Sequence, residues 1–181
     1  MVTITGDESS CMDSKRLSAR TKQPGHDRTF ITSETNFSAA VRAILPADKY
    51  EVIDKPPGLA RIFASTEGLR DLGITPEVSI KNLQTGRVMY FEVKKQGTRG
   101  NAEERAMKHH TTQFYKTLAA FTGMPYHAYY TVFCESLAKD RRYTQKFPYL
   151  IEQGQYFLWV DYDQELLRRF IVDEICARFL D

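Results

Sequence analysis

The stretch from residue 76 to residue 96 constrains the fold most, because two strand-like runs lie on either side of a turn. The first run covers residues 76–80, the second covers residues 87–96, and turn-forming residues occupy 82–86. The longer run alternates, with Met89, Phe91 and Val93 on one face and Tyr90, Glu92 and Lys94 on the other. In the shorter run, Glu77 and Ser79 oppose Val78 and Ile80. This pattern predicts a β-hairpin.

The rest of the chain mixes helical and strand-like patterns. Apolar residues recur at helical spacing in residues 32–45, in residues 100–121 and after Asp163, which we expect to cap the last helix. The other expected strands cover residues 50–53, 126–135, 143–151 and 155–162, and short helical turns are expected in 58–72. This order predicts an α/β fold with a central mixed β-sheet flanked by helices.

The domain organisation follows from length and composition. We expect a single domain over residues 29–181, preceded by a flexible basic arm over residues 1–28 that is poor in large apolar side chains. No run of about 18 apolar residues and no apolar leader occurs, so we expect a cytoplasmic protein without a membrane span. Cys11, Cys134 and Cys176 are far apart, and this spacing favours free thiols.

Charge is unevenly distributed although the net charge is only +2. Residues 87–116 contain seven Lys or Arg against three Glu, and residues 139–146 contain four against one Asp. Residues 161–181 reverse the balance, with six acidic residues against three Arg. This distribution is typical of a protein that presents one positive face to phosphates, and equally of ordinary solvated surface.

Glu77, Glu92 and Lys94 suggest a chemical site. Glu92 and Lys94 share a strand face, and the hairpin would bring Glu77 beside them. Mg²⁺ commonly takes one or two carboxylates and completes its coordination with water and phosphate. A neighbouring lysine can orient or deprotonate a water, so these residues suit phosphodiester hydrolysis. The alternative is a cross-strand Glu–Lys pair on a solvated sheet face.

A second candidate is the segment RGNAEER at residues 99–105, which opens a predicted helix after a glycine-flanked basic turn. Asn pairs with adenine through two hydrogen bonds, and Arg does the same with guanine. The segment therefore resembles a short base-reading element. The alternative is a charged helix start in which Asn101 is the N-cap and Glu104 completes a capping box.

Together the two candidates resemble the EcoRI/MunI branch of the PD-(D/E)xK type II restriction endonucleases, most closely its MunI-like members. Residues 74–80 are similar to the Pro-Asp strand of that family, residues 91–96 to its Glu-x-Lys strand, and residues 99–105 match its RGNAxER segment. Weaker similarity extends from about residue 30 to residue 162. The resemblance implies a restriction-endonuclease-like core and a homodimer that binds a palindrome in double-stranded DNA.

The resemblance also implies residue roles. Mg²⁺ would be the cofactor. The metal-binding set would be Glu77, Glu92 and Val93, and Lys94 would orient or deprotonate the attacking water. The DNA-binding set would be Arg99, Gly100, Asn101, Ala102, Glu104 and Arg105. Within this set, Asn101, Ala102 and Arg105 would read an AATT centre, and Glu104 would hold these reading residues across the dimer. Arg99 would read the outer base pair, so CAATTG is the first candidate site. Apart from the resemblance, Glu34 on the first predicted helix would approach the metal without ligating it, or equally would be a charge in the capping region of that helix.

Two departures from the family pattern keep other functions open. Glu77 replaces the usual Asp and reaches further by about 1.5 Å, so one alternative is a DNA-binding protein with weakened or lost cleavage. Only Gly97 and Thr98 separate the two motifs, where the family has a longer insertion, so the DNA contacts of that insertion do not carry over and the outer base pair stays open. Another alternative is a repair or junction nuclease, against which Asn101 and Arg105 argue because such an enzyme needs no base readers.

The adjacent pair His109 and His110 follows the recognition segment. His110 lies on the apolar face of the predicted helix, and no other ligand stands at metal-binding spacing. We therefore expect packing or phosphate contact from this pair rather than catalysis.

Overall fold

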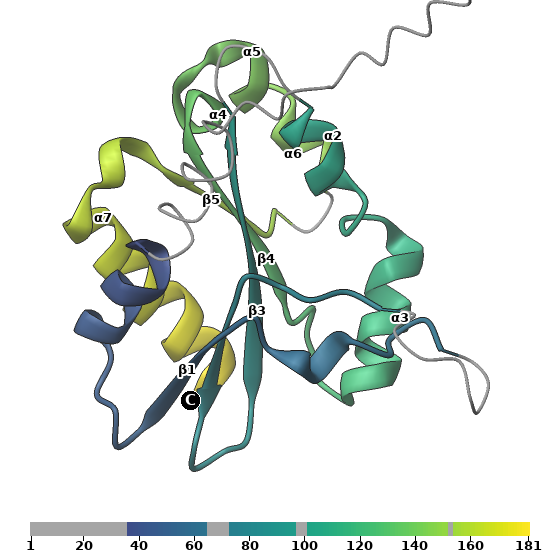
Figure 1. Cartoon of the computed structure of the whole chain (residues 1–181), viewed down its shortest axis with the longest axis vertical. Coiled ribbons are helices and arrows are strands. Elements are labelled where there is room, and N and C mark those ends of the chain that lie inside the picture. The colour runs from purple at the N-terminus through teal and green to yellow at the C-terminus, as the bar shows by residue number, and fades with distance from the viewer. Residues whose placement is uncertain (1–35, 65–72, 97–100, 152–153) are drawn as a thin grey trace, which may run out of the picture.

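The structure is a computed structural model that describes residues 36–64, 73–96, 101–151 and 154–181. The expected arm at residues 1–28, and the candidate residues Glu34, Arg99 and Gly100, lie outside the described residues. Figure 1 shows a central sheet with helices on both sides and a group of short helices at one end.

The sheet has five strands in the order β1-β2-β3-β4-β5. The strands are β1 (Tyr50–Asp54), β2 (Val78–Asn82), β3 (Val88–Gln96), β4 (Tyr129–Glu135) and β5 (Tyr156–Trp159). The first three pair antiparallel, whereas β3, β4 and β5 pair parallel. The predicted hairpin is present as β2 and β3, and the sheet is mixed as expected. Parallel pairing requires crossovers, and the helices between β3 and β4 and between β4 and β5 supply them.

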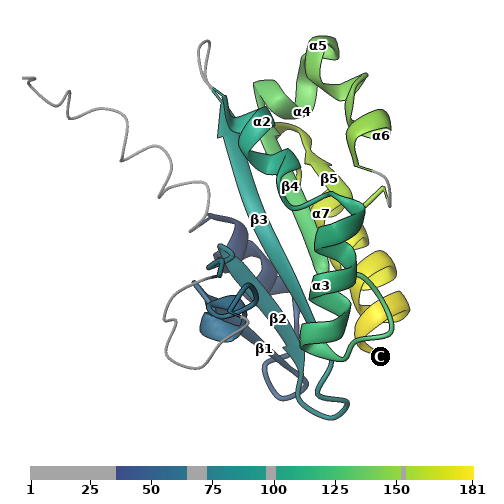
Figure 2. The same cartoon turned by 90° about the vertical axis from the view of Figure 1, so that its right-hand side faces the viewer.

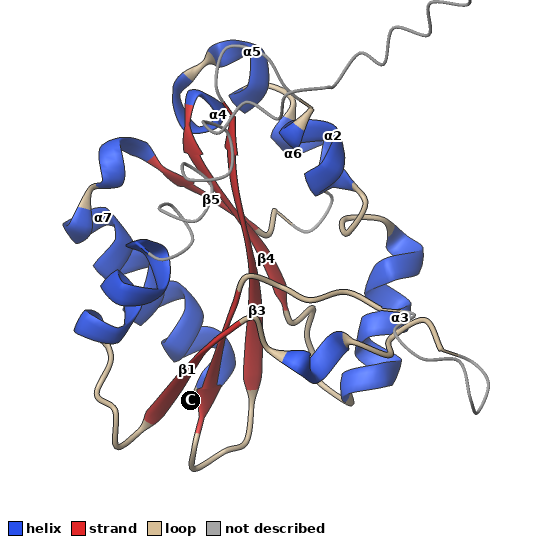
Figure 3. Cartoon of the chain, in the orientation of Figure 1, coloured by secondary structure: helices blue, strands red, loops and turns tan. Residues whose placement is uncertain are grey.

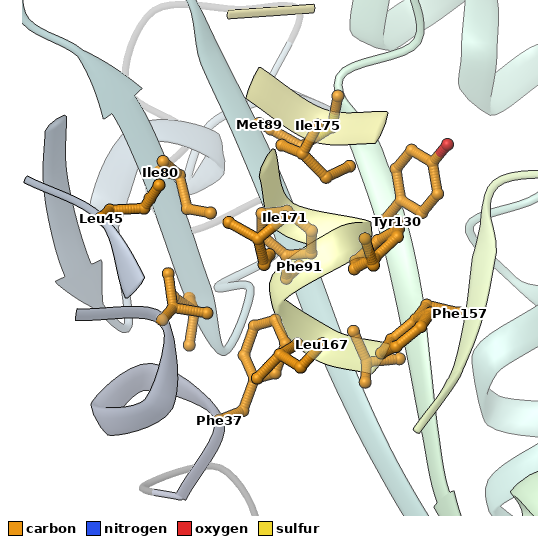
Figure 4. Close-up of a cluster of buried hydrophobic side chains, with 14 of the residues drawn as sticks. Phe37, Leu45, Ile80, Met89, Phe91, Tyr130, Phe157, Leu167, Ile171 and Ile175 are labelled. Atoms are coloured by element: carbon orange, nitrogen blue, oxygen red, sulfur yellow. The ribbon is translucent and has the colours of Figure 1, made fainter. Parts of the chain in front are cut away.

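One face of the sheet packs against a helix at residues 36–44 and the C-terminal helix. The C-terminal helix consists of α7 (Gln164–Arg169) and its π-helical continuation η3 (Phe170–Leu180). Figure 4 shows this cluster, with Phe37 on one side, Phe91 in the centre and Leu167 and Ile171 above the strands. Odd-numbered residues of β3 point into it, as the alternation predicts.

The opposite face packs against α2 (Ala102–Met107), α3 (Thr112–Thr122) and the short helix η1 (Pro57–Leu59). Figures 2 and 3 show α2 and α3 in sequence along this side of β3 and β4. The apolar contacts form two separate clusters, one around Phe114 and Tyr129 and the other around Phe133 and Phe147. Polar residues of β3 lie on this face.

The single helix predicted over residues 100–121 is wrong, because the structure has two helices there. α2 ends at Met107, and α3 begins after Thr111, whose hydroxyl accepts a hydrogen bond from the Phe114 N–H at 3.2 Å. The extended backbone of Thr111 and this cap start a new helix. Gly123, in the left-handed conformation with φ 66°, ends α3 where the sequence predicted a stop.

The strand predicted over residues 143–151 is also wrong. The chain there forms α5 (Arg141–Thr144) and α6 (Phe147–Leu150), after α4 (Ser136–Lys139). Asp140 caps α5 by accepting the Arg142 N–H at 2.8 Å. Pro148 lies in the first turn of α6, where its missing N–H costs nothing, whereas a strand would lose a ladder bond.

The last two predicted elements are present with changed extents. The strand predicted over 155–162 is shorter, because the chain turns into the 3-10 helix η2 (Val160–Tyr162) after Trp159. Asp163 caps the last helix as predicted, accepting the Glu165 and Leu166 N–H groups. In η3 the wider π-helical turn brings Leu180 into the core, while Phe179 is only partly buried.

Candidate active site

Glu92 and Lys94 lie on the polar face of β3 and contact each other directly. The Lys94 Nζ donates to the Glu92 Oε1, and the Lys94 and Glu92 side chains are only 10% and 12% exposed. Two charges this deep require partners, because an isolated buried charge is strongly destabilising. Glu92 and Lys94 therefore form a mostly buried ion pair on the sheet rather than a solvated surface pair.

Glu77 directly precedes β2 and is held between the neighbouring strands. Its N–H donates to the Phe91 carbonyl at 2.9 Å, and its carbonyl accepts the Lys55 N–H at 2.9 Å. The backbone thus lies beside the residue before Glu92. The Glu77 carboxylate is 12% exposed and forms an ion pair with the Lys55 ammonium.

Lys55 was not among the predicted site residues. It follows β1, has a left-handed φ of 49° and precedes Pro56. A non-glycine residue in that conformation is uncommon and is held by its surroundings. Its 22-residue separation from Glu77 gives no local pattern, so only the pairing of β1 with β2 brings the two together.

Tyr129 and His109 extend the site from β4 and from the link between α2 and α3. The Tyr129 hydroxyl donates to the Glu92 Oε2 at 3.5 Å and lies 2.9 Å from the His109 Nδ1. Burial raises the pKa of Tyr129, and the Glu92 carboxylate raises it further. Burial also lowers the pKa of His109; Glu92 opposes this shift, and Lys94 adds to it. These neighbours limit the ways in which the Glu92 carboxylate can rotate.

His110 is buried and packs away from the charged residues. Its Nε2 lies 2.8 Å from the Thr131 Oγ1, and its Nδ1 lies 3.4 Å from the Tyr115 hydroxyl. Burial lowers its pKa to about 4. Of the two roles expected for the histidine pair, packing is the one that His110 fills.

Residues 101–105 of the recognition segment form the start of α2, next to the end of β3. Asn101, Glu104 and Arg105 are exposed, and Ala102 is buried. Asn101 occupies the N-cap position but its side chain makes no capping hydrogen bond, so the capping-box alternative is wrong for Asn101. The Gln96 Oε1 accepts the Ala102 N–H instead, at 2.8 Å. Glu103 forms an ion pair with Lys146 at 3.2 Å.

The oxygen groups at this site suit a hard divalent cation such as Mg²⁺. Glu77 and Glu92 offer carboxylates, and Val93, whose side chain is buried, can offer only its carbonyl oxygen. Within the described ranges no group of three or more His, Cys, Asp or Glu side chains is arranged to hold a metal. Two carboxylates are sufficient for Mg²⁺ when water and phosphate complete the coordination, whereas a structural zinc site needs four protein ligands.

Comparison with known proteins agrees with this arrangement. A family model described as type II restriction enzyme MunI matches residues 12–177. The chain belongs to the MunI family of type II restriction enzymes. It is therefore a type II restriction endonuclease, a site-specific nuclease that acts on DNA.

A solved structure supports the fold of this MunI-family chain. The crystal structure of MunI restriction endonuclease in complex with cognate DNA superposes with a TM-score of 0.58 at 24% sequence identity, over 70% of this chain and 81% of that chain. The restriction-endonuclease-like core expected from the sequence is thus confirmed. A search of curated proteins found no match. In the part of the chain that the structure describes, no helix is long and apolar enough to cross a membrane.

Proposed function

We propose that this restriction endonuclease is a Mg²⁺-dependent homodimer that cleaves double-stranded DNA in the cytoplasm at a short palindrome with an AATT centre, CAATTG being the first candidate. The observation that carries the proposal is the buried Glu92–Lys94 pair on β3, two residues before Gln96, which contacts the start of α2. Catalytic groups and the recognition segment are thereby adjacent along one strand.

The proposed catalytic roles follow from the chemistry of each side chain. Glu77, Glu92 and the Val93 carbonyl would hold Mg²⁺. When bound, Mg²⁺ supplies Lewis-acid stabilisation of the phosphate and lowers the pKa of a water. The Lys94 ammonium lies against Glu92, where its remaining protons can hold the attacking water and offset charge that develops on the phosphate.

Glu77 would need to exchange its present partner. The Lys55 side chain is 54% exposed, so its ammonium can move to solvent or to a DNA phosphate at modest cost. Glu77 would then offer its carboxylate oxygens to the metal. Lys55 would in that event be a phosphate contact close to the scissile bond.

The proposed base readers lie on the exposed side of α2. Asn101 and Arg105 are both exposed, and their side chains have the donor and acceptor groups that suit adenine and guanine in the major groove. Ala102, expected to read the centre with them, is buried in the chain, whereas Glu104 is exposed and would hold the reading residues across the dimer. Arg99 would read the outer base pair, and Gly100 belongs to the same proposed DNA-binding set. A palindromic site would match the two-fold symmetry of a homodimer.

A second candidate is a DNA-binding protein of this family with weakened cleavage. The observation that favours it is the ion pair between Glu77 and Lys55, which occupies the carboxylate that departs from the family pattern. In this case the recognition segment would retain its role, and the metal would bind too weakly for turnover.

Digestion of a plasmid of known sequence separates the candidates. With Mg²⁺ we expect discrete fragments that map to CAATTG or another site with an AATT centre, and no fragments with a chelator. Sequence-specific gel shifts without fragments would favour the second candidate. Nicking at branches, or without sequence preference, would contradict both and point to a repair or junction nuclease.

A further inference from the structure

Gln96 joins the catalytic strand to the recognition segment through one buried side chain. It is the last residue of β3, lies two residues after Lys94 and is 5% exposed. Its Oε1 accepts the Ala102 N–H at 2.8 Å, and its Nε2 donates to the Tyr143 hydroxyl at 2.5 Å. Its backbone carbonyl also accepts a hydrogen bond from Ser136. Both ends of the amide are therefore bonded to other elements.

The orientation of this amide is set by its partners. A backbone N–H can only donate, so the side-chain oxygen must face Ala102 and the nitrogen must face Tyr143. Tyr143 is buried, and its hydroxyl also accepts the Arg142 Nη2 at 2.9 Å. The guanidinium of Arg142 lies over the Tyr143 ring, 4.6 Å from its centre. Tyr143 is thus itself held in place, and it holds Gln96.

The bond to Ala102 is a helix cap supplied from outside the helix. The first N–H groups of a helix have no partner within it, and a side chain at the N-cap position usually satisfies one of them. Asn is among the best N-cap residues, yet Asn101 makes no such bond, and its φ of −125° and ψ of 30° are not those of an extended cap. Gln96 instead satisfies the N–H of Ala102, the first residue of the helix, which an N-cap side chain does not bond, and Asn101 is exposed.

We propose that Gln96 is a specificity-determining positioning residue, which ties the first turn of α2 to the catalytic strand and so holds the exposed Asn101 in position for a base edge. The inference rests on the proposed function, because it assigns Asn101 to base reading. The position of α2 relative to Glu92 and Lys94 then depends on the Gln96 side chain, which touches neither metal nor base.

The proposal predicts what happens when the cap is removed. Without an acceptor at residue 96, the Ala102 N–H loses its partner, and the start of α2, with Asn101, is no longer tied to β3. Gln96→Met, which keeps the size of the side chain, should therefore weaken binding to the specific site and spare binding to unrelated DNA. Gln96→Glu keeps an acceptor facing Ala102 and should retain most of the discrimination.

The test measures the ratio of affinities for specific and unrelated DNA by gel shift in a chelator, so that cleavage does not interfere. The site is first identified with the wild-type protein. Relative to wild type, we expect this ratio to fall at least about tenfold in Gln96→Met, as for loss of one base contact, and less than about threefold in Gln96→Glu. Gln145→Met, at an exposed glutamine next to α5, is the matched control and should match wild type.

A double-variant cycle tests whether Gln96 acts through Asn101. If it does, Gln96→Met combined with Asn101→Ala should discriminate no worse than Asn101→Ala alone. Additive losses, or a folded Gln96→Met protein that discriminates like wild type, would overturn the proposal. If Gln96→Met does not fold, Gln96→Glu decides, because discrimination as poor as that of Asn101→Ala would refute the capping role. A wild-type protein without sequence preference would instead refute the proposed function itself, and the inference with it.

Discussion

Lys94 and Glu92 are two opposite charges held on one strand where little water reaches them. Removing either partner leaves the other uncompensated, so variants at these positions affect both stability and chemistry. The lysine is the more informative position, because its loss leaves both proposed carboxylate ligands in place.

We expect Lys94→Ala to reduce the cleavage rate by at least about a hundredfold, since a positioned acid or base commonly contributes that much. Sequence-specific DNA binding should be unchanged, because α2 is untouched. Single-turnover cleavage and gel shifts measure the two quantities. Lys95→Ala is the control, since the neighbouring lysine alternates to the other face and pairs with Glu135. Loss of binding with cleavage intact would refute this division of roles.

Glu77 is the residue at which the proposed activity is most sensitive to side-chain length. Glu77→Asp shortens the reach and should break the ion pair with Lys55, leaving a carboxylate of the length usual in the family. We expect the variant to cleave at lower Mg²⁺ concentrations than the wild type, as measured by a Mg²⁺ titration of the cleavage rate. A higher Mg²⁺ requirement in the variant would show that the local backbone is adapted to glutamate.

At the scale of elements, α2 is too short to be stable alone. Its buried residues Ala102 and Ala106 pack beside Phe133, and Gln96 caps its first turn. These contacts leave its exposed side free for recognition. A six-residue helix thus depends on the sheet for its existence as well as for its position.

This arrangement makes Arg105→Ala a test of the exposed side of α2. We expect it to weaken binding to the specific site by about 1–3 kcal/mol, the usual range for one bidentate base contact. Binding to unrelated DNA should change much less. Lys116→Ala, at an exposed position on α3, should have no such effect on specificity. Equal losses on both DNA types would make Arg105 a phosphate contact instead.

Two histidines packed between α3 and β4 should make the fold sensitive to acid. Burial lowers the pKa of His110 to about 4 and that of His127 to about 3, from an ordinary value near 6.5. The folded state therefore favours the neutral rings. Their contribution to stability is complete above pH 6.5 and falls as the pH drops from 6.5 towards 4, because the unfolded chain then binds more protons.

His127→Leu should reduce this loss of stability at low pH. Both ring nitrogens of His127 are buried without a hydrogen-bond partner in the described structure, so their removal costs little and should raise stability at neutral pH by about 1 kcal/mol. Thermal unfolding between pH 7.5 and pH 4.5 checks both effects. A variant with an unchanged pH profile would assign the acid sensitivity to other groups.

At the scale of the whole molecule, the two faces of the mixed sheet have different roles, one in the apolar core and the other in the candidate active site. Its apolar face packs against the helix at residues 36–44 and the C-terminal helix, and its polar face has the candidate catalytic residues. The short helices α4, α5 and α6 gather with α2 at one end, as both views show (Figures 1 and 2). The basic segment at residues 139–146 lies in that group, so one of the predicted positive regions adjoins the recognition segment.

Assembly is the prediction that belongs to the whole molecule. If the protein acts on a palindrome as a homodimer, sedimentation should give twice the chain mass of 20.9 kDa without DNA, and that mass plus the mass of one duplex with DNA. Binding should then require both half-sites, and DNA with one half-site altered should bind much more weakly. A monomer in complex with a full palindrome would contradict the proposed assembly.

Local sequence patterns predicted the parts of the fold that depend on near neighbours. The alternation along residues 87–96 indicated which face Glu92 and Lys94 share, because side chains alternate along any strand. The same reasoning failed for residues 143–151, where Tyr143, Phe147 and Ile151 are buried at a spacing that suits helices packed on Phe133. A short apolar segment is compatible with both structures until its packing partner is known.

The sequence by itself determined the family, the hairpin and the residue types available for catalysis, since these depend on composition and short-range order. Only the tertiary structure decided which side chains meet. Lys55 contacts Glu77, Tyr129 and His109 lie beside Glu92, and Gln96 accepts the Ala102 N–H at the start of α2. Such contacts join residues on different strands and helices, and their geometry is set by strand register and by the burial of two apolar faces.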